Sequence, residues 1–333
     1  MTIWQRIADG LTRGERACLI TVVAAEGSSP REAGARMLAT AGGGYSGTIG
    51  GGALEWQALS EAARLLATHP DGRGITRSLV LGPDLGQCCG GRVSLRFEAF
   101  AEADHRWIAP LAGVEATGMF VTTGMPDARG IVIRTPDGPS HPPQPGVLRE
   151  EFGMRRTPVL LFGAGHIGRA LVLALAPLPF CVRWIDPRAE AFPCHQPANT
   201  TAILADNPVD LVTSAEPGTL MLAITHSHVL DFDLVAAALQ NPAITFTGVI
   251  GSATKRARFA GRLRALGLTD ADITRLICPI GLPDLGSKEP AIIAAGVVVQ
   301  LLRQRHESVR LPLNTAPCPL PDRVFRRKTS ALA

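Results

Sequence analysis

The chain has 333 residues, of which 46% are apolar and 19% are charged, and its formal net charge is +4. This composition is typical of a folded protein of about two domains and excludes a disordered chain. The small net charge and the aromatic content of 5% argue against a nucleic-acid binder, which needs a dense basic patch with interleaved aromatic residues.

The first predicted domain, residues 1–135, mixes helices and strands. Helices are expected at 3–11 and 53–68, and in the second of them the apolar residues share one face. Strands are expected at 17–25, 35–40, 78–81, 92–97, 119–123 and 131–134. Polar and glycine-rich turns separate them, which predicts an α/β domain with many tight connections.

A second domain is predicted at 154–310, after a linker at 136–153 that contains five prolines between Pro136 and Gly146. Its expected strands are 159–162, 181–185, 202–204, 219–225 and 245–250, and its expected helices are 167–176, 233–239, 254–266 and 289–304. This alternation predicts a Rossmann-like parallel sheet with helices on both faces. The basic segment 311–333 is predicted to be a mobile tail.

The predicted location is the cytoplasm, without membrane attachment. The most apolar stretch, 291–302, is too short to span a membrane and contains Gln300. Charged residues between Arg6 and Arg16 interrupt any secretory signal. The seven cysteines have no disulfide-scaffold spacing, so free thiols in a reduced compartment are expected.

A glycine-rich loop opens the second domain, between a predicted strand and a predicted helix. It has the spacing Gly163-x-Gly165-x-x-Gly168, with His166 inside it, and Asp186 ends the next strand. In this context the loop predicts phosphate binding at a helix N-terminus, with Asp186 as a candidate ribose ligand. The alternatives are a loop that binds nothing and an aspartate that only belongs to a turn.

Two further segments follow predicted strands of the same sheet. One carries His226, His228, Asp231 and Asp233, which suggest a metal, although an aspartate that caps the next helix explains them more simply. The other carries Ser252 and Lys255 at the start of a helix, where a cation indicates a bound anion or a merely solvated face.

Two candidate sites lie in the first domain. Adjacent thiols at Cys88 and Cys89, flanked by Gln87, Gly90 and Gly91, could ligate a soft metal or carry sulfur. Glycine-rich turns could form an anion cradle or be ordinary turns, and their candidate residues are Ser28, Ser29, Arg31, Gly50, Gly51, Gly52 and Glu55.

These segments, taken in order, resemble the XdhC/CoxI family. The resemblance in the first domain rests on 27–31, 34–37, 47–52 with Glu55, and 87–91. In the second domain it rests on 163–168, 186–188, 225–228, 251–256 and 278–288. It implies an N-terminal α/β domain of the XdhC/CoxI type followed by a Rossmann-like domain.

The resemblance also implies a function. Proteins of this family are thought to bind the molybdenum cofactor, molybdopterin, as cargo and to insert it into apo xanthine dehydrogenase, while a cysteine desulfurase supplies sulfur to molybdenum. It further implies a homodimer, contact with enzymes of cofactor biosynthesis, and a carrier rather than an enzyme. Cys88 and Cys89 are the candidate metal contacts, and a nucleotide at the 163–168 loop stays open.

Two other functions remain open from the sequence. An NAD(P)-dependent oxidoreductase would use the Rossmann-like domain, with His226 or His228 as proton donor. An assembly scaffold would contact the dehydrogenase without binding a cofactor. The adjacent thiols favour the carrier, because neither alternative needs them.

Overall fold

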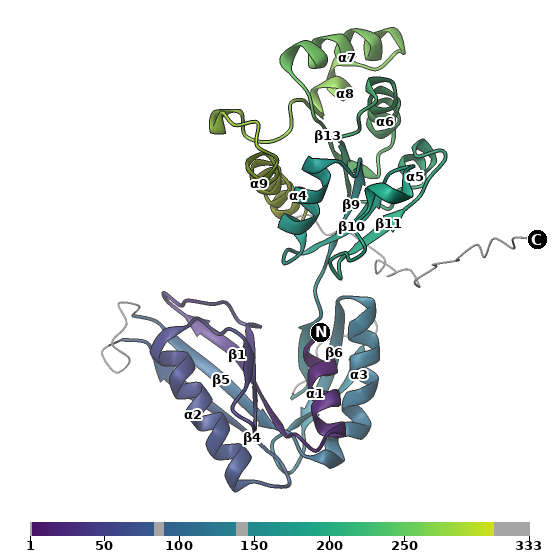
Figure 1. The fold of residues 1–333 in the computed structure, drawn as a ribbon. Coiled ribbons are helices and arrows are strands. Elements are labelled where there is room, and N and C mark those ends of the chain that lie inside the picture. The colour runs from purple at the N-terminus through teal and green to yellow at the C-terminus, as the bar shows by residue number, and fades with distance from the viewer. Residues whose placement is uncertain (1, 83–89, 138–145, 310–333) are drawn as a thin grey trace, which may run out of the picture. The chain divides into compact units, whose positions relative to one another are not determined.

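The structure, a computed structural model, describes residues 2–82, 90–137 and 146–309. The chain divides into two compact units, Met1–Met154 and Arg155–Ala333 (Figure 1). Each has its own hydrophobic core, as expected for domains of this size.

A five-stranded antiparallel sheet forms the centre of the first unit, with the strand order β3-β2-β1-β5-β4. The strands are β1 Ala17–Glu26, β2 Arg36–Thr40, β3 Tyr45–Gly47, β4 Arg73–Val80 and β5 Arg92–Ala99. Helix α2, Gly52–Thr68, covers one face of this sheet and buries the predicted apolar positions, among them Leu54 and Leu65. Each buried leucine contributes about 1.5–3 kcal/mol.

The opposite face of this sheet packs against a second layer, as Figure 1 shows. This layer holds α1 Ile3–Thr12, the short 3-10 turn Glu102–Asp104 and α3 His105–Thr117. A three-stranded sheet of order β7-β6-β8 completes it, with β6 Phe120–Pro126, β7 Val132–Asp137 and β8 Leu148–Phe152. The rings of Phe100, Trp107 and Phe152 surround that of Trp4.

The structure corrects the predicted boundary of the first domain. Helix α3 lies within the predicted first domain, where no helix was expected. Strand β8 lies inside the predicted linker 136–153 but pairs with β6. The first unit therefore extends to Met154 rather than to residue 135. Residues 138–145 of that linker and the tail 311–333 lie outside the described residues.

A six-stranded parallel sheet forms the centre of the second unit, with the order β11-β10-β9-β12-β13-β14. The strands are β9 Thr157–Phe162, β10 Phe180–Ile185, β11 Thr200–Ile203, β12 Thr219–Ala223, β13 Ile244–Val249 and β14 Leu276–Ile277. In order of appearance this is 3-2-1-4-5-6, the doubly wound Rossmann arrangement. The predicted Rossmann-like fold is thus confirmed.

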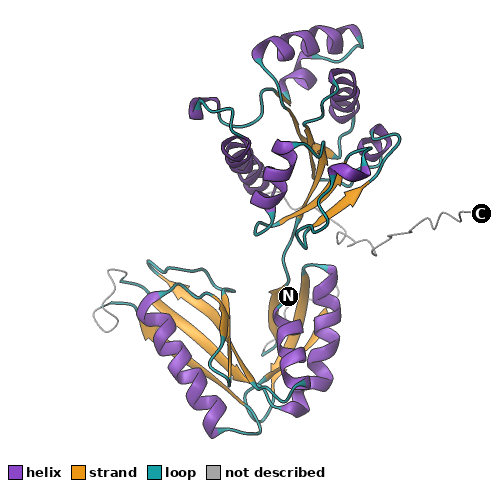
Figure 2. Ribbon diagram, viewed as in Figure 1, coloured by secondary structure: helices purple, strands orange, loops and turns teal. Residues whose placement is uncertain are grey.

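Helices cover both faces of the parallel sheet, as Figure 2 shows. Helices α4 His166–Leu175 and α9 Pro290–Val309 pack on one face. Helices α5 Val209–Thr213, α6 His228–Gln240, α7 Ala253–Ala265 and α8 Asp270–Thr274 pack on the other. Short 3-10 turns lie at Ala189–Ala191 and Pro283–Leu285.

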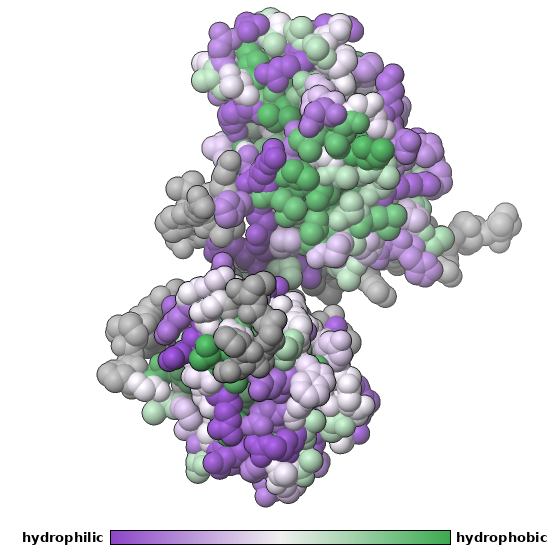
Figure 3. All heavy atoms as spheres, turned by 90° about the vertical axis from the view of Figure 1, so that its left-hand side faces the viewer, coloured by the Kyte–Doolittle hydropathy of each residue, from purple (hydrophilic) through white to green (hydrophobic). Residues whose placement is uncertain are grey.

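Apolar side chains gather on the outer side of α4 and α9 (Figure 3). Leu173 of α4 is 69% exposed, and Ile292 and Val299 of α9 are only half-buried. Among the described helices, none is both long and apolar enough to cross a membrane.

Candidate functional site

Three loops that the sequence singled out meet at one end of the five-stranded sheet. A Cβ atom added to Gly91 would lie 2.5 Å from the carbonyl oxygen of Ser28, and one added to Gly50 would lie 2.5 Å from Cγ of Pro30. The turn 27–31 therefore contacts both 90–91 and the glycine-rich loop 50–52. The structure thus brings together two of the predicted sites of the first unit.

This convergence predicts that alanine at two adjacent glycines has different effects on stability. Gly91→Ala should separate the loops, because its Cβ would meet the backbone oxygens of Ser28 and Glu26 at 2.5 and 2.6 Å. Gly90→Ala should be tolerated, because no atom of the described residues lies within 4 Å of the added Cβ. We expect Gly91→Ala to lower the free energy of unfolding by about 1–3 kcal/mol, as overpacking does. Thermal melts of both variants check this, and equal melting temperatures would contradict it.

The loop Gly50–Gly52 forms the backbone cradle that the sequence suggested. All three glycines have positive φ values, of +132°, +80° and +63°, which other residues rarely adopt. The amide groups of Ile49, Gly50 and Gly51 converge on Oε1 of Glu55, at 2.9, 3.3 and 2.9 Å. The hydroxyl group of Thr48 donates to the same oxygen. A carboxylate of the chain itself therefore occupies this cradle.

The pKa of Glu55 reflects this arrangement. Desolvation alone would raise it, but the hydrogen bonds from Thr48, Gly51, Ile49 and Gly50 together lower the pKa below its ordinary value. The ionised carboxylate thus stabilises the loop above the pKa of about 4.3 that an unfolded glutamate has. This stabilisation is lost as the pH falls through the lower pKa of the folded state.

We therefore expect Glu55→Gln to weaken the loop at pH 7 and to remove its acid sensitivity. Hydrogen exchange of the 49–52 amides should rise in wild type as the pH falls from 5 toward 3, after correction for intrinsic rates. In Glu55→Gln the corrected exchange should be faster at pH 7 and should change little over that interval. A parallel pH response in both proteins would contradict the role of Glu55.

The other predicted residues of the first unit lie around these loops. Ser28 and Arg31 are exposed, and the hydroxyl group of Ser29 donates to the carbonyl oxygen of Arg31 at 2.8 Å. Gln87, Cys88 and Cys89 lie outside the described residues. Cys89 directly precedes Gly90 in the chain, and Gly90 belongs to the group of converging loops.

In the second unit, the three glycines of the 163–168 loop have different surroundings. A Cβ added to Gly163 would lie 2.4 Å from the carbonyl oxygen of Ile224, and one added to Gly168 would lie 2.2 Å from that of Gly163. Within the described part of the chain, no atom lies within 4 Å of one added to Gly165, which is exposed beside His166. Gly163 and Gly168 thus permit close packing, whereas Gly165 leaves room where a phosphate would approach.

Asp186 lies beneath this loop with partners from its own chain. It is 3% exposed and accepts hydrogen bonds from the amide of Ala164 at 2.8 Å and from the guanidinium group of Arg188 at 2.9 and 3.0 Å. Desolvation would raise the pKa of Asp186, but these hydrogen bonds outweigh it and lower the pKa. The carboxylate therefore holds the glycine loop to the end of β10, and its proposed bond to a ribose is untested.

The segments after β12 and β13 meet through a buried ion pair. Lys255 donates to Asp231 at 2.6 Å and to the carbonyl oxygen of Ile250 at 2.8 Å, and Asp231 is 1% exposed. Asp231 also accepts from the hydroxyl group of Thr225 at 2.8 Å. The negative partner of Lys255 is thus Asp231, and in this structure the cation does not indicate an external anion.

Serines rather than aspartates cap the two helices here. Ser227 accepts from the amide of Leu230 to cap α6, and Ser252 accepts from the amide of Lys255 to cap α7. This corrects the expectation that Asp231 or Asp233 caps α6. His226 and His228 are exposed at the start of α6. The described residues contain no group of three His, Cys, Asp or Glu that could hold a metal ion.

Two family models match the sequence of this chain. A model described as the XdhC Rossmann domain matches residues 159–301, and a model of the XdhC and CoxI family matches residues 11–77. Together they cover more than half of the chain. The chain belongs to the XdhC and CoxI family. The matched ranges include the cradle 50–52 and every predicted site residue of the second unit.

Two other proteins are similar to this XdhC-family chain. A crystal structure described as a xanthine dehydrogenase from Bacillus halodurans superposes with a TM-score of 0.69 at 21% identity, over 92% of this chain and 96% of that one. The uncharacterized protein YqeB of Escherichia coli K12 is 25% identical over 86% of this chain. The chain spans 43% of the length of YqeB.

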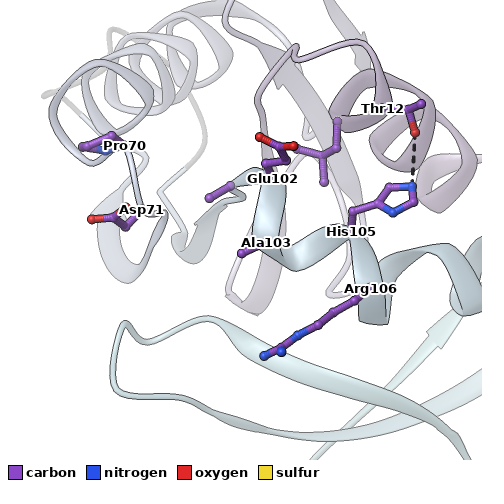
Figure 4. A pocket seen from close by; sticks show the side chains of 9 residues that line it. Thr12, Pro70, Asp71, Glu102, Ala103, His105 and Arg106 are labelled. Atoms are coloured by element: carbon purple, nitrogen blue, oxygen red, sulfur yellow. Dashed lines mark hydrogen bonds between the residues drawn. The ribbon is translucent and has the colours of Figure 1, made fainter.

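A pocket elsewhere in the first unit contains none of the predicted site residues of this XdhC-family chain. It lies between the ends of α1 and α2 and the start of α3 (Figure 4). Its lining includes Asp71, Glu102 and Arg106, and His105 is hydrogen bonded to the hydroxyl group of Thr12 at 3.2 Å. The cradle 50–52 precedes α2 and Asp71 follows it, so about 25 Å of helix separates the two.

Sequence reasoning missed the buried charges of the first unit. Arg134 and Glu98 are both fully buried and form an ion pair at 2.6 Å, and Glu150 pairs with the same arginine at 2.8 Å. A signal was present in β5, where Arg96 and Glu98 alternate with apolar residues. Charges at regular strand positions indicate a polar face, but only the second layer reveals that this face is buried.

Proposed function

We propose that this chain binds the molybdenum cofactor in its molybdopterin form and delivers it to apo xanthine dehydrogenase. In this proposal the cofactor is cargo, and it stays on the chain while a cysteine desulfurase supplies sulfur to molybdenum. Membership of the XdhC and CoxI family supports a role in maturation. The observation that carries the proposal is the meeting of the loops 27–31, 50–52 and 90–91.

The chemistry of these loops suits the cargo. Molybdopterin presents a phosphate, a polar pterin and a metal held by sulfur. Exposed Ser28 and Arg31 supply a hydroxyl and a cation for polar and anionic groups. The thiols of Cys88 and Cys89, next to Gly90 in the chain, are the soft donors that a sulfur-bound metal or a transferred sulfur requires.

In this proposal the desulfurase, and not this chain, supplies the sulfur, so the proposed role is that of a maturation chaperone rather than a catalyst. Its proposed partners are apo xanthine dehydrogenase, the desulfurase and enzymes that synthesise the cofactor. Homodimer formation is part of the same proposal. In the second unit, the open space at Gly165 supports a phosphorylated ligand, either a nucleotide or the phosphate of the cargo.

Gel filtration with molybdenum analysis tests the carrier function. Purified protein is mixed with free molybdenum cofactor, and molybdenum is measured in the protein peak. We expect near-stoichiometric retention in wild type and loss of most of it in the Cys88→Ala/Cys89→Ala variant. Cys194→Ala is the matched control, because Cys194 is an exposed thiol of the second unit.

Other outcomes would separate the competing functions. Absence of molybdenum from the wild-type peak would contradict the carrier. Equal retention in the double variant and wild type would contradict the role of the thiols. A nicotinamide titration then discriminates an oxidoreductase from a scaffold, because only the oxidoreductase changes the absorbance of the bound dinucleotide.

A further inference from the structure

Three polar residues of the first unit form a row across adjacent strands. Thr21 of β1 pairs directly with Arg36 of β2 on one side and with Arg96 of β5 on the other. Directly paired residues of antiparallel strands point to the same face, with Cβ atoms about 4.5–5.5 Å apart. This face is the one opposite α2, because Cys18 and Ile20 point into the core beneath α2. One hydroxyl and two guanidinium groups therefore lie side by side.

The row is buried, yet each of its residues has a donor without an acceptor. Thr21 is 2% exposed, and the side chains of Arg36 and Arg96 are 10% and 11% exposed. Thr21 Oγ1, Arg36 Nε and Arg96 Nη1 have no hydrogen-bond partner among the described residues. Buried donors are rarely left unsatisfied, since each costs about 1–3 kcal/mol.

The carboxylates that contact the row leave some of its donors unsatisfied. Both carboxylate oxygens of Glu98 accept hydrogen bonds from Arg134, at 3.0 and 2.6 Å. One oxygen of Glu150 accepts a hydrogen bond from the same arginine at 2.9 Å. The other oxygen of Glu150 lies 3.8 Å from Arg36 and 3.4 Å from Arg96, too far for good hydrogen bonds. Among the described residues, the three arginines thus have direct contacts with only two carboxylates, Glu98 and Glu150.

The remaining acidic group near the row has partners of its own. Glu115 of α3 accepts from the backbone amides of Ile3 and Trp4, at 3.2 and 2.7 Å. Arg36 donates to the carbonyl oxygen of Glu151 at 2.7 Å and stacks on the ring of Phe152 at 3.7 Å. Neither contact satisfies Nε of Arg36.

We propose that the row Thr21, Arg36 and Arg96 binds a phosphate-type oxyanion, either free inorganic phosphate or the phosphate group of a monoester. An oxyanion bound over Thr21 would accept hydrogen bonds from all three unpartnered donors. Hydrogen bonds between guanidinium groups and a phosphate are among the strongest that side chains form. This site is separate from the loops 27–31, 50–52 and 90–91, so it does not depend on the proposed carrier function.

The same face supplies a polar approach to the row. Thr76 of β4 pairs with Arg96, and Ser78 pairs with Ser94. The hydroxyl oxygens of Ser78 and Ser94 lie 2.9 Å apart. Thr76 and Ser78 are exposed, whereas Thr21 is buried. The buried row therefore lies next to exposed hydroxyl groups on the same face of the sheet.

The pKa of Arg36 reflects its burial. Loss of hydration lowers it to about 10, and the attraction of Glu150, Glu115 and Glu98 does not offset that loss. A bound anion would raise this pKa again.

Isothermal titration with inorganic phosphate tests the site in the full-length protein at constant ionic strength, with chloride as the background anion. We expect saturable binding with one phosphate per chain. Arg96→Gln and Thr21→Val should each weaken it about tenfold or more, as the loss of a hydrogen bond to a charged group does. Thr21→Val keeps the shape of the side chain and removes only the unpartnered hydroxyl, so the fold is expected to persist.

Two further variants separate binding from a structural role. Glu150→Gln removes the carboxylate that both arginines share, so phosphate should bind several-fold more tightly. Arg77→Gln, on the adjacent strand but paired with Glu61 of α2, should leave affinity unchanged. A titration with phenyl phosphate distinguishes the sources, since only a site open to the hydroxyl surface accepts a monoester.

The proposal is overturned if wild type binds no phosphate below about 10 mM, roughly a −2.7 kcal/mol threshold. It is also overturned if Arg96→Gln and Thr21→Val bind as wild type does. Water molecules that satisfy the three donors would give the first of these results. If wild type binds phosphate but retains no molybdenum, the proposed carrier function is contradicted and the phosphate site is not.

Discussion

Replacing Arg134 by alanine will lower the free energy of unfolding by about 3–5 kcal/mol, the usual cost of removing one partner of a buried ion pair. Arg134 and Glu98 are fully buried, and the arginine donates two hydrogen bonds to that glutamate. Without it, Glu98 keeps only the amide of Val132 as a donor among its described contacts. The loss also removes the cation that lies 5.4 Å from the ring of Trp4.

Hydrogen exchange of the β1 and β5 amides measures this effect in the first unit separately from the second. The double variant Arg134→Met/Glu98→Leu is the matched control, because apolar replacement of both partners is often neutral or stabilising. We expect it to recover most of the protection lost in Arg134→Ala. A single variant as stable as wild type would show that the pair contributes nothing.

The second unit could be predicted from the sequence because its signals are local. Buried strands such as residues 159–162 are short apolar runs, and most of them are followed by a glycine or polar turn and then by a helix. Right-handed crossovers leave few topologies for such an alternation. The Rossmann-like sheet and the position of residues 163–168 between β9 and α4 were therefore confirmed. The four predicted helices correspond to α4, α6, α7 and α9, whereas the short elements α5, α8 and β14 were not predicted.

Two elements of the second layer of the first unit, α3 and β8, could not be predicted in the same way. Helix α3 contains Pro110 and Gly113, which disfavour a helix. It forms because Ile108 and Leu111 bury themselves against α1 and the sheet. Strand β8 follows a proline-rich stretch and is charged at Arg149–Glu151, so only its pairing with β6 and the ion pairs of Glu150 place it in the fold.

The candidate sites show the same division between local and distant information. The cradle 50–52 was visible as three glycines, but its occupant depends on the side chain of Glu55 reaching back by one turn. Asp231 and Lys255 are 24 residues apart, and only the adjacency of β12 and β13 brings them together. Composition and spacing therefore locate loops, whereas the partners of buried charges require the packed structure.

Gly165→Asp should weaken the binding of a phosphorylated ligand to the second unit about 100-fold, as like charges at close range do. Gly165 is exposed, its added Cβ meets no atom within 4 Å, and its φ of −76° is open to other residues. The substitution thus places a carboxylate where the N-terminus of α4 offers amide groups to a phosphate. Binding of ADP, NAD and the molybdenum cofactor is measured for each protein.

Two alanine variants distinguish ligand binding from packing at this loop. Gly165→Ala should bind within threefold of wild type, because a methyl group neither repels a phosphate nor meets the protein. Gly168→Ala should instead destabilise the unit, because its Cβ would lie 2.2 Å from the carbonyl oxygen of Gly163. If Gly165→Asp binds every ligand as wild type does, or wild type binds none, the loop serves only the close packing of α4 on β9. If affinity falls only in Gly165→Asp, then Gly165 serves ligand binding, whereas Gly163 and Gly168 serve the packing of the fold.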